Sequence, residues 1–173
     1  MKIIFILDQI QAGLGGAEKG DQPLGGKYMA IGSVQMFENY LGAVNGEVMA
    51  TLYCGDDYFA ADAETNALKL TAMVKKLNPD VVICGPCFNY DKYGLMAGKV
   101  AATITDKLHK PVIAAMSQEC AEAIELYKDQ VDIVKMPKKG GTGLTESMET
   151  MLKLCQLKVN QEDTTAFTAE YCY

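Results

Sequence analysis

The sequence predicts an α/β fold, a flavodoxin-like three-layer sandwich built on a doubly wound, five-stranded parallel sheet. Short apolar runs, aliphatic on both faces, alternate with segments whose apolar residues recur three and four positions apart. Two of these helical segments stop at a proline, at Asn78-Pro79 and Lys110-Pro111, directly before the next apolar run. Repeated alternation of strand and helix favours a parallel sheet covered by helices on both faces.

The five expected strands are the apolar runs at residues 2–7, 48–53, 81–84, 112–116 and 131–136. We expect the strand order 2-1-3-4-5, because the strongly apolar first run suits the centre of the sheet. Helices are expected over residues 29–41, 68–77, 95–108, 121–127 and 144–157. Residues 1–158 are predicted to form a single α/β domain. Residues 159–173 are polar and then mildly aromatic without a clear helical period, so they are expected to be a C-terminal tail, either mobile or docked as a strand on a partner.

Composition narrows the class of function. A net charge of −6 argues against nucleic acid or an anionic membrane as the partner. No apolar run approaches the roughly 20 residues of a membrane helix. Asp8 and Gln9 interrupt the apolar start and no small-residue cleavage site follows, so we expect a buried strand of a cytoplasmic protein. Six scattered cysteines and one histidine favour reduced thiols over a disulfide scaffold and predict no metal site.

Polar, glycine and cysteine residues follow each expected strand, at the edge where ligands bind in open α/β sheets. The segments are Asp8 and Gln9 with the glycine-rich residues 13–26, CGDDYF (54–59), CGPCFN (84–89), residues 117–120 and KKGGTG (138–143). The opposite loops are plain turns. The asymmetry predicts a binding site at the carboxyl ends of the strands.

Two of these loops allow an anion-binding interpretation beside a purely structural one. GLGGAEK is glycine-rich, but Gly13, Gly15 and Gly16 do not meet the G-x-G-x-x-G spacing, and no G-K-[ST] follows. A flavin or nucleotide binder therefore remains an alternative function. In KKGGTG, Lys138 and Lys139 precede a glycine-rich helix start, which suits an anion but equally suits a simple loop-to-helix junction.

Cys84 and Cys87 have the Cys-x-x-Cys spacing of a redox dithiol. The surroundings differ from a thioredoxin motif, because the chain contains no tryptophan to precede the first cysteine. Ile83-Cys84 also has the character of a strand interior, which would bury Cys84. A redox pair and a pair of small buried residues are both open interpretations.

Three loops in the same order resemble component B of the glycine, sarcosine and betaine reductases, a family related to D-proline reductase. They are QAGLGGAEKGD (11–21), TLYCGDDYFA (51–60) and PDVVICGPCFNYDKYGLMAG (79–98), and the resemblance spans about residues 1–158. It implies substrate-binding roles for Gly13, Gly15, Gly16, Glu18, Lys19, Asp21, Gly55, Asp56, Tyr58, Gly85, Pro86, Phe88, Asn89 and Tyr93. It also implies that Cys54 is the exposed, candidate catalytic thiol, because the family often has alanine where Cys84 and Cys87 stand.

The resemblance implies a subunit of a complex that reductively cleaves a C–N bond of a small amino acid or amine in anaerobic metabolism. Partner chains would supply the pyruvoyl group and the selenocysteine, with no cofactor intrinsic to this chain. Lys19 or the Lys138-Lys139 pair would hold a substrate carboxylate, and Glu18 or Asp56 an ammonium. Members of the family are longer, and their selenocysteine lies in a part with no counterpart here. We expect an oligomer or hetero-complex; the alternative is a non-catalytic small-ligand-binding or assembly module.

Overall fold

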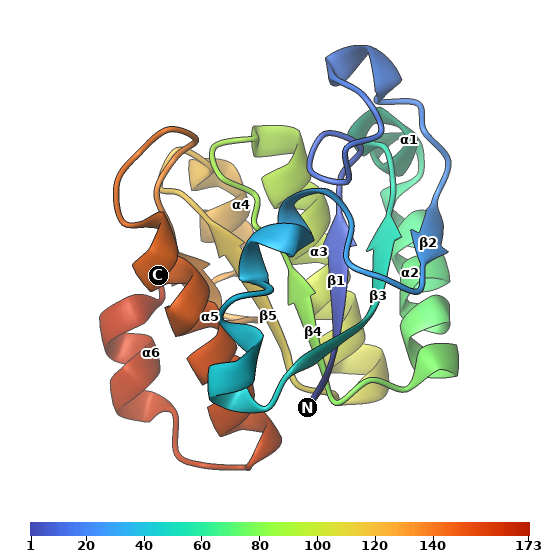
Figure 1. Ribbon diagram of the computed structural model, residues 1–173. Helices are drawn as coiled ribbons and strands as arrows, with labels where there is room; N and C mark the ends of the chain where they lie inside the picture. The colour runs from blue at the N-terminus through green and yellow to red at the C-terminus, as the bar shows by residue number, and fades with distance from the viewer.

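Five parallel strands form the centre of the fold in the computed structural model, which describes residues 1–173 (Figure 1). Across the sheet their order is β3 (Glu47–Tyr53), β1 (Lys2–Leu7), β4 (Val81–Cys84), β5 (Val112–Met116) and β6 (Ile133–Lys135). The predicted order, with the first strand central, is therefore found. The last strand is shorter than the predicted 131–136.

The predicted number of strands is wrong, because a sixth strand, β2 (Gly25–Lys27), pairs antiparallel with β3 at the sheet edge. The architecture is accordingly a mixed six-stranded sheet. The residues of β2 have no apolar pattern from which a strand could be predicted. Gly25 of this strand packs closely on Tyr53: a Cβ on Gly25 would lie 2.6 Å from the Tyr53 hydroxyl oxygen, so a larger residue there would displace the Tyr53 side chain.

Helices cover both faces of the sheet. One layer contains α1 (Asp56–Ala61), α2 (Ala63–Leu77), α3 (Asp91–Leu108) and α4 (Ala121–Tyr127), and the other contains α5 (Leu144–Val159) and α6 (Thr165–Tyr171), as Figure 1 shows. α2 and α3 end shortly before Pro79 and Pro111, as the sequence predicted, and their C-cap residues, Asn78 and His109, adopt the left-handed conformation. None of these helices is both long and apolar enough to cross a membrane.

The helix predicted over residues 29–41 is wrong. Two 3₁₀ helices, η2 (Gly32–Phe37) and η3 (Leu41–Val44), occupy this region in front of the sheet in Figure 1. Gly32 has φ 54°, outside the range of a right-handed helix, and a Cβ there would lie 1.9 Å from the Gln11 carbonyl oxygen, so only glycine fits this position. Of the apolar residues in this region Val34 and Phe37 are buried, whereas Met29 is 57% exposed. The Phe37 ring packs on Phe5 with centroids 4.9 Å apart. Periodicity here identified part of the core but not the type of helix.

The C-terminal segment contains the helix α6, so the expectation of a tail without helical structure is wrong. Phe167 and Tyr171 are four residues apart and stack with ring centroids at 4.7 Å, a helical spacing. Beyond the helix, Cys172 bridges to Val134, and Tyr173 N donates to the Ile133 carbonyl at 3.1 Å. The segment therefore closes the β6 edge of the sheet.

Candidate functional site

The loops after β1 and β3 meet at the carboxyl edge of the sheet. Gly55 N donates to the Gln22 carbonyl and Tyr58 N donates to the Gly20 carbonyl, both at 2.8 Å. A Cβ on Gly55 would lie 2.2 Å from the Gly20 carbonyl oxygen, so only glycine fits this contact. Two of the three loops singled out in the sequence are therefore one structural unit.

Gln9 and Asp56 connect the starts of these two loops. Gln9 Nε2 donates to Asp56 Oδ1 at 2.9 Å, and Asp56 N donates to Gln9 Oε1 at 3.0 Å. Asp57 N also donates to Asp56 Oδ1 at 2.9 Å. The Asp56 carboxylate is thus already engaged by the protein, which leaves it less able to bind an ammonium group than the sequence suggested.

The glycine-rich loop lies on the surface above this edge. Gly13 and Gly15 have φ values of 72° and 148°, which a side chain rarely adopts. Glu18 Oε1 accepts from Gly16 N at 2.9 Å, and this bond holds the pKa of the Glu18 carboxyl below its usual value. The exposed side chains of this loop and its short 3₁₀ helix η1 (Ala17–Lys19) include Glu18, Lys19 and Asp21.

The loop after β4 connects to the two loops beyond it. Cys87 N donates to the Ala115 carbonyl at 2.8 Å, and the Phe88 carbonyl accepts from Ser117 N at 2.8 Å. Asn89 Oδ1 accepts from Lys139 N at 2.9 Å. Gly85 and Pro86 are buried beneath these contacts, whereas Asn89 is exposed. The predicted anion ligands are Lys138 and Lys139. They therefore lie on a loop that is hydrogen-bonded to the loop after β4.

Beneath the loops lie a buried acid and a buried phenol. Tyr93 from α3 is fully buried and donates its hydroxyl to the Ile6 carbonyl at 2.6 Å. This bond gives the predicted site residue a structural role, because it joins α3 to β1. Asp8, directly after β1, is also fully buried. Burial raises the pKa of Asp8 to about 7, and the nearby Asp56 charge acts in the same direction. Asp8 was not among the predicted site residues, although its position after a fully buried strand was a usable signal.

All six cysteines are free and buried. Cys54 is 0% exposed, and burial raises its pKa to about 12. The expectation that Cys54 is the exposed thiol is therefore wrong: its side chain belongs to the hydrophobic core, although its backbone begins the loop after β3. Burial likewise raises the pKa values of Cys84 and Cys87. Thiols of this kind are poor nucleophiles at neutral pH.

Hollows of the surface flank the site. One, of about 380 Å³, is lined by Asp56 and by residues of α1, α2 and α3. Another, of about 530 Å³, includes Glu119, Lys138 and Tyr173. The chain contains no cluster of three or more His, Cys, Asp or Glu side chains that could hold a metal ion. The carboxyl edge thus offers hydrogen-bonding and charged groups but no exposed thiol.

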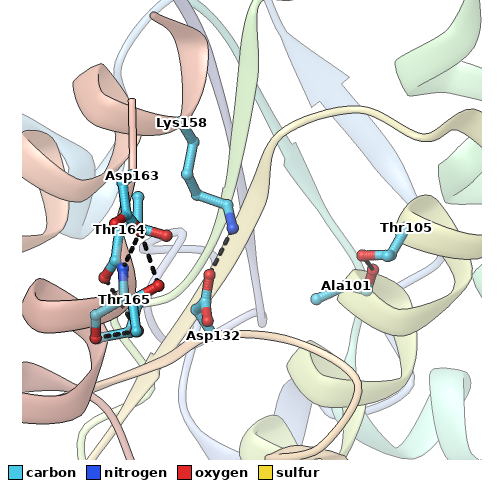
Figure 2. A network of polar contacts seen from close by, with 8 residues as sticks. Ala101, Thr105, Asp132, Lys158, Asp163, Thr164 and Thr165 are labelled. Atoms are coloured by element: carbon cyan, nitrogen blue, oxygen red, sulfur yellow. Dashed lines mark hydrogen bonds and ion pairs between the residues drawn. The ribbon is translucent and has the colours of Figure 1, made fainter. Parts of the chain in front are cut away.

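A larger hollow of about 910 Å³ lies at the opposite, amino edge of the sheet and contains none of the predicted site residues. Figure 2 shows part of its wall, where Lys158 of α5 points toward the Asp132 carboxylate and forms an ion pair with it. Its lining is mostly polar, and its lysines are engaged: Lys110 donates to the Pro79 carbonyl, and Lys128 pairs with Glu125. We assign no function to this hollow.

Comparison with known proteins gives one family. The family described as "Glycine/sarcosine/betaine reductase selenoprotein B" matches residues 1–173. Glycine reductase complex component B subunit gamma of Carboxydothermus hydrogenoformans is 34% identical over 135 residues, which are 77% of this chain and 30% of that protein. Sarcosine reductase complex component B subunit beta of Peptoclostridium acidaminophilum is 28% identical over 162 residues, 94% of this chain and 36% of that protein.

Betaine reductase complex component B subunit beta of the same organism is 22% identical over 156 residues, 88% of this chain and 34% of that protein. This chain therefore spans about a third of the length of the relatives it matches. No solved structure matches it significantly.

Proposed function

The chain belongs to the glycine/sarcosine/betaine reductase selenoprotein B family, and on this basis we propose that it is a subunit of a complex that reductively cleaves the C–N bond of a small amino acid or amine. The observation that carries the proposal is the family match over the whole chain, together with loops that come together at one sheet edge in the structure. The order of the five parallel strands supports a flavodoxin-like assignment of the fold.

We assign this chain to substrate binding and positioning. The exposed Lys19 and the Lys138-Lys139 pair are candidate partners of a substrate carboxylate. Lys139 lies near Tyr90, with its Nζ 3.3 Å from the Tyr90 hydroxyl, so it is held beside the third loop. Gly13, Gly15 and Gly16 would let the backbone approach a small ligand closely.

The chemistry that breaks the bond would come from partner chains. A selenol is largely ionised at neutral pH and supplies a nucleophile, and a pyruvoyl group supplies a carbonyl that captures an amine. Burial of all six cysteines favours a nucleophile from elsewhere. It also favours the second candidate function, a non-catalytic ligand-binding or assembly module, which would bind the same partners without contributing to turnover.

The experiment is purification of the tagged chain from its source cells without oxygen, followed by mass spectrometry of the proteins retained with it. We expect a chain with a blocked, pyruvoyl-type N-terminus and a chain with selenocysteine. The purified assembly should release ammonia or methylamine from glycine or sarcosine with a dithiol as electron donor. An assembly that contains both chains but needs no copy of this one for turnover would favour the assembly module. Recovery of the chain alone, without partners or turnover, would contradict the proposal.

A further inference from the structure

Asp8 lies where the carboxyl ends of β1 and β4 meet. In the sheet β1 pairs on one side with β3 and on the other with β4, so the chain changes direction across the sheet at this point. The crevice beside such a switch point is the usual ligand site of open α/β sheets. Asp8 directly follows β1, and Ala12 N donates back to its carbonyl at 3.0 Å in the turn that leads to the glycine-rich residues.

One oxygen of the Asp8 carboxyl group has no hydrogen-bond donor. Oδ1 accepts from Gln11 N at 2.6 Å, whereas Oδ2 is buried without any partner. The residue is 0% exposed. Buried polar atoms in proteins nearly always have a partner, and a buried carboxylate without one is costly. An acceptor oxygen in this position is therefore available to a donor that arrives with a ligand.

No side chain around Asp8 donates to Oδ2 or supplies a compensating positive charge; the backbone amides of Gln11, Ile10 and Asp8 lower the pKa of this carboxyl, but burial outweighs them. The Asp56 carboxylate is the charged group that acts on Asp8, and it is negative. Cys87 and Tyr93 are the other titratable neighbours, and burial raises both of their pKa values, so they stay neutral. Tyr93 already donates its hydroxyl to the Ile6 carbonyl at 2.6 Å.

The two acids that the sequence suggested for an ammonium are less suitable. Glu18 is exposed and accepts from Gly16 N, and Asp56 Oδ1 accepts from both Gln9 and Asp57. Asp8 is the acid at this edge that combines complete burial with an unpartnered oxygen. The Coulomb attraction of an ammonium to Asp8 would be less screened by water than its attraction to Glu18, and it would offset part of the cost of burying the Asp8 charge.

We propose that Asp8 binds the ammonium group of the substrate and that Oδ2 accepts a hydrogen bond from an N–H of that group. The inference rests on the proposed function for its substrates and deepens it. A primary or secondary ammonium, as in glycine or sarcosine, carries such an N–H, whereas the quaternary ammonium of betaine has none. The structure therefore assigns this chain to substrates with an N–H, in preference to fully methylated ones.

Access to Asp8 requires movement of the segment that follows it. This segment is held by backbone bonds from Ala12 N to the Asp8 carbonyl at 3.0 Å and from Leu14 N to the Gln9 carbonyl at 2.9 Å, and by the bond from Gly16 N to Glu18 Oε1 at 2.9 Å. A ligand that reaches Asp8 must offset the loss of such bonds. A cation that enters would stabilise the ionised form of Asp8, whose raised pKa near 7 leaves it partly protonated at neutral pH. Binding should accordingly release a proton.

The test is calorimetric titration of the full chain with sarcosine, glycine and betaine at pH 7 in two buffers that differ in ionisation heat. We expect sarcosine and glycine to bind with release of about half a proton per site at pH 7 and almost none at pH 8.5, because a group of pKa near 7 is ionised there. Asp8→Asn should weaken sarcosine binding at least tenfold and abolish the proton release. The matched control, Asp129→Asn, removes an exposed carboxylate at the opposite edge and should bind as the wild type does.

A readout on the wild type keeps the test valid if Asp8→Asn does not fold. Carbon-13 NMR of labelled aspartate should show the Asp8 carboxyl resonance titrating near pH 7 and moving to the ionised position on addition of sarcosine. Equal binding of betaine and sarcosine, unchanged binding in Asp8→Asn, or no binding of any of the three compounds would overturn the inference. An assembled complex that turns over normally with Asp8→Asn would overturn it too, and would leave the proposed function intact.

Discussion

Gln9 and Asp56 hold each other by two reciprocal hydrogen bonds, one from Gln9 Nε2 to Asp56 Oδ1 at 2.9 Å and one from Asp56 N to Gln9 Oε1 at 3.0 Å. The pair joins the carboxyl end of β1 to the start of α1, residues that are 47 apart in the sequence. Gln9 is fully buried, so the two bonds are shielded from water on its side. The link fixes how the first two loops of the site sit together.

Replacing Gln9 by leucine should therefore destabilise the protein. The change removes both bonds and leaves Asp56 N without a partner, which costs about 1–3 kcal/mol of the free energy of unfolding. Urea denaturation followed by circular dichroism measures this loss of unfolding free energy. Gln22→Leu is the control: its amide donates only to the neighbouring Pro23 carbonyl, at 3.2 Å near the surface, and its loss should cost less than about 0.5 kcal/mol. Equal losses in the two variants would show that the pair is not important for stability.

Gly55→Ala should separate the first two loops. The new Cβ would lie 2.2 Å from the Gly20 carbonyl oxygen, and the backbone there must move, which costs about 1–3 kcal/mol or more. Gly42→Ala provides a matched comparison, because a Cβ at Gly42 meets nothing within 4 Å. Thermal unfolding of the two variants should show a lower midpoint for Gly55→Ala alone. A midpoint unchanged from the wild type in Gly55→Ala would contradict the close contact.

Iodoacetamide should not label Cys54 in the native protein. The thiol is fully buried and its pKa is raised to about 12, so very little thiolate exists near neutral pH. Mass spectrometric mapping should find all six cysteines unmodified in buffer and modified in guanidinium chloride. Rapid labelling of Cys54 in the native state, ahead of Cys84, would instead restore the interpretation of Cys54 as the reactive thiol.

Asp8 should make the stability of the protein fall as the pH rises from about 4 to about 7. In the unfolded chain its carboxyl ionises near the ordinary value of 3.8, whereas in the folded protein its pKa is about 7. Between these values the folded state binds the extra proton, so the free energy of unfolding declines by roughly 4 kcal/mol over the window and is flat above it. The carboxyls with lowered pKa, such as Glu18 and Asp62, are exposed and act with the opposite sign at lower pH.

Denaturation of the wild type and Asp8→Asn from pH 4.5 to 8.5 measures this effect. The variant cannot ionise at position 8, so its curve should lack the decline over this range. A wild-type curve that rises or stays level between pH 4.5 and 7, or a variant curve parallel to it, would contradict a raised pKa of Asp8.

Deleting residues 165–173 should uncover the β6 edge. The deletion removes the backbone bond from Tyr173 N to the Ile133 carbonyl and the bridge between Cys172 and Val134. An uncovered strand edge promotes association with other chains. Light scattering should therefore show larger particles for the truncated chain, whereas Tyr28→Ser, a change at a side chain 81% exposed far from this edge, should leave the particle size unchanged. Identical particle sizes for the truncated and full chains would contradict a role of this segment in covering the sheet.

The sequence by itself determined the α/β class, the order of the five parallel strands and the edge that carries the loops. Hydrophobic runs such as 2–7 and 81–84 are buried on both faces, and burial on both faces is a property that local composition reveals. Prolines 79 and 111 marked two helix ends for a similarly local reason, because they restrict the residue before them. The same reasoning brought the loops after β1, β3 and β4 to one edge.

Only the tertiary structure decided which residues of that edge are buried and which are paired. β2 lacks an apolar pattern and is recognised only by its pairing, in which Gly25 and Gly26 lie close against Tyr53 and Leu52 of the neighbouring strand. Cys54 begins a glycine and aspartate loop, yet its side chain points into the core, because the direction of a side chain at a strand end depends on the sheet around it. Asp8 became a candidate only when the structure showed an oxygen without a donor, since a missing hydrogen bond depends on every segment packed around that atom.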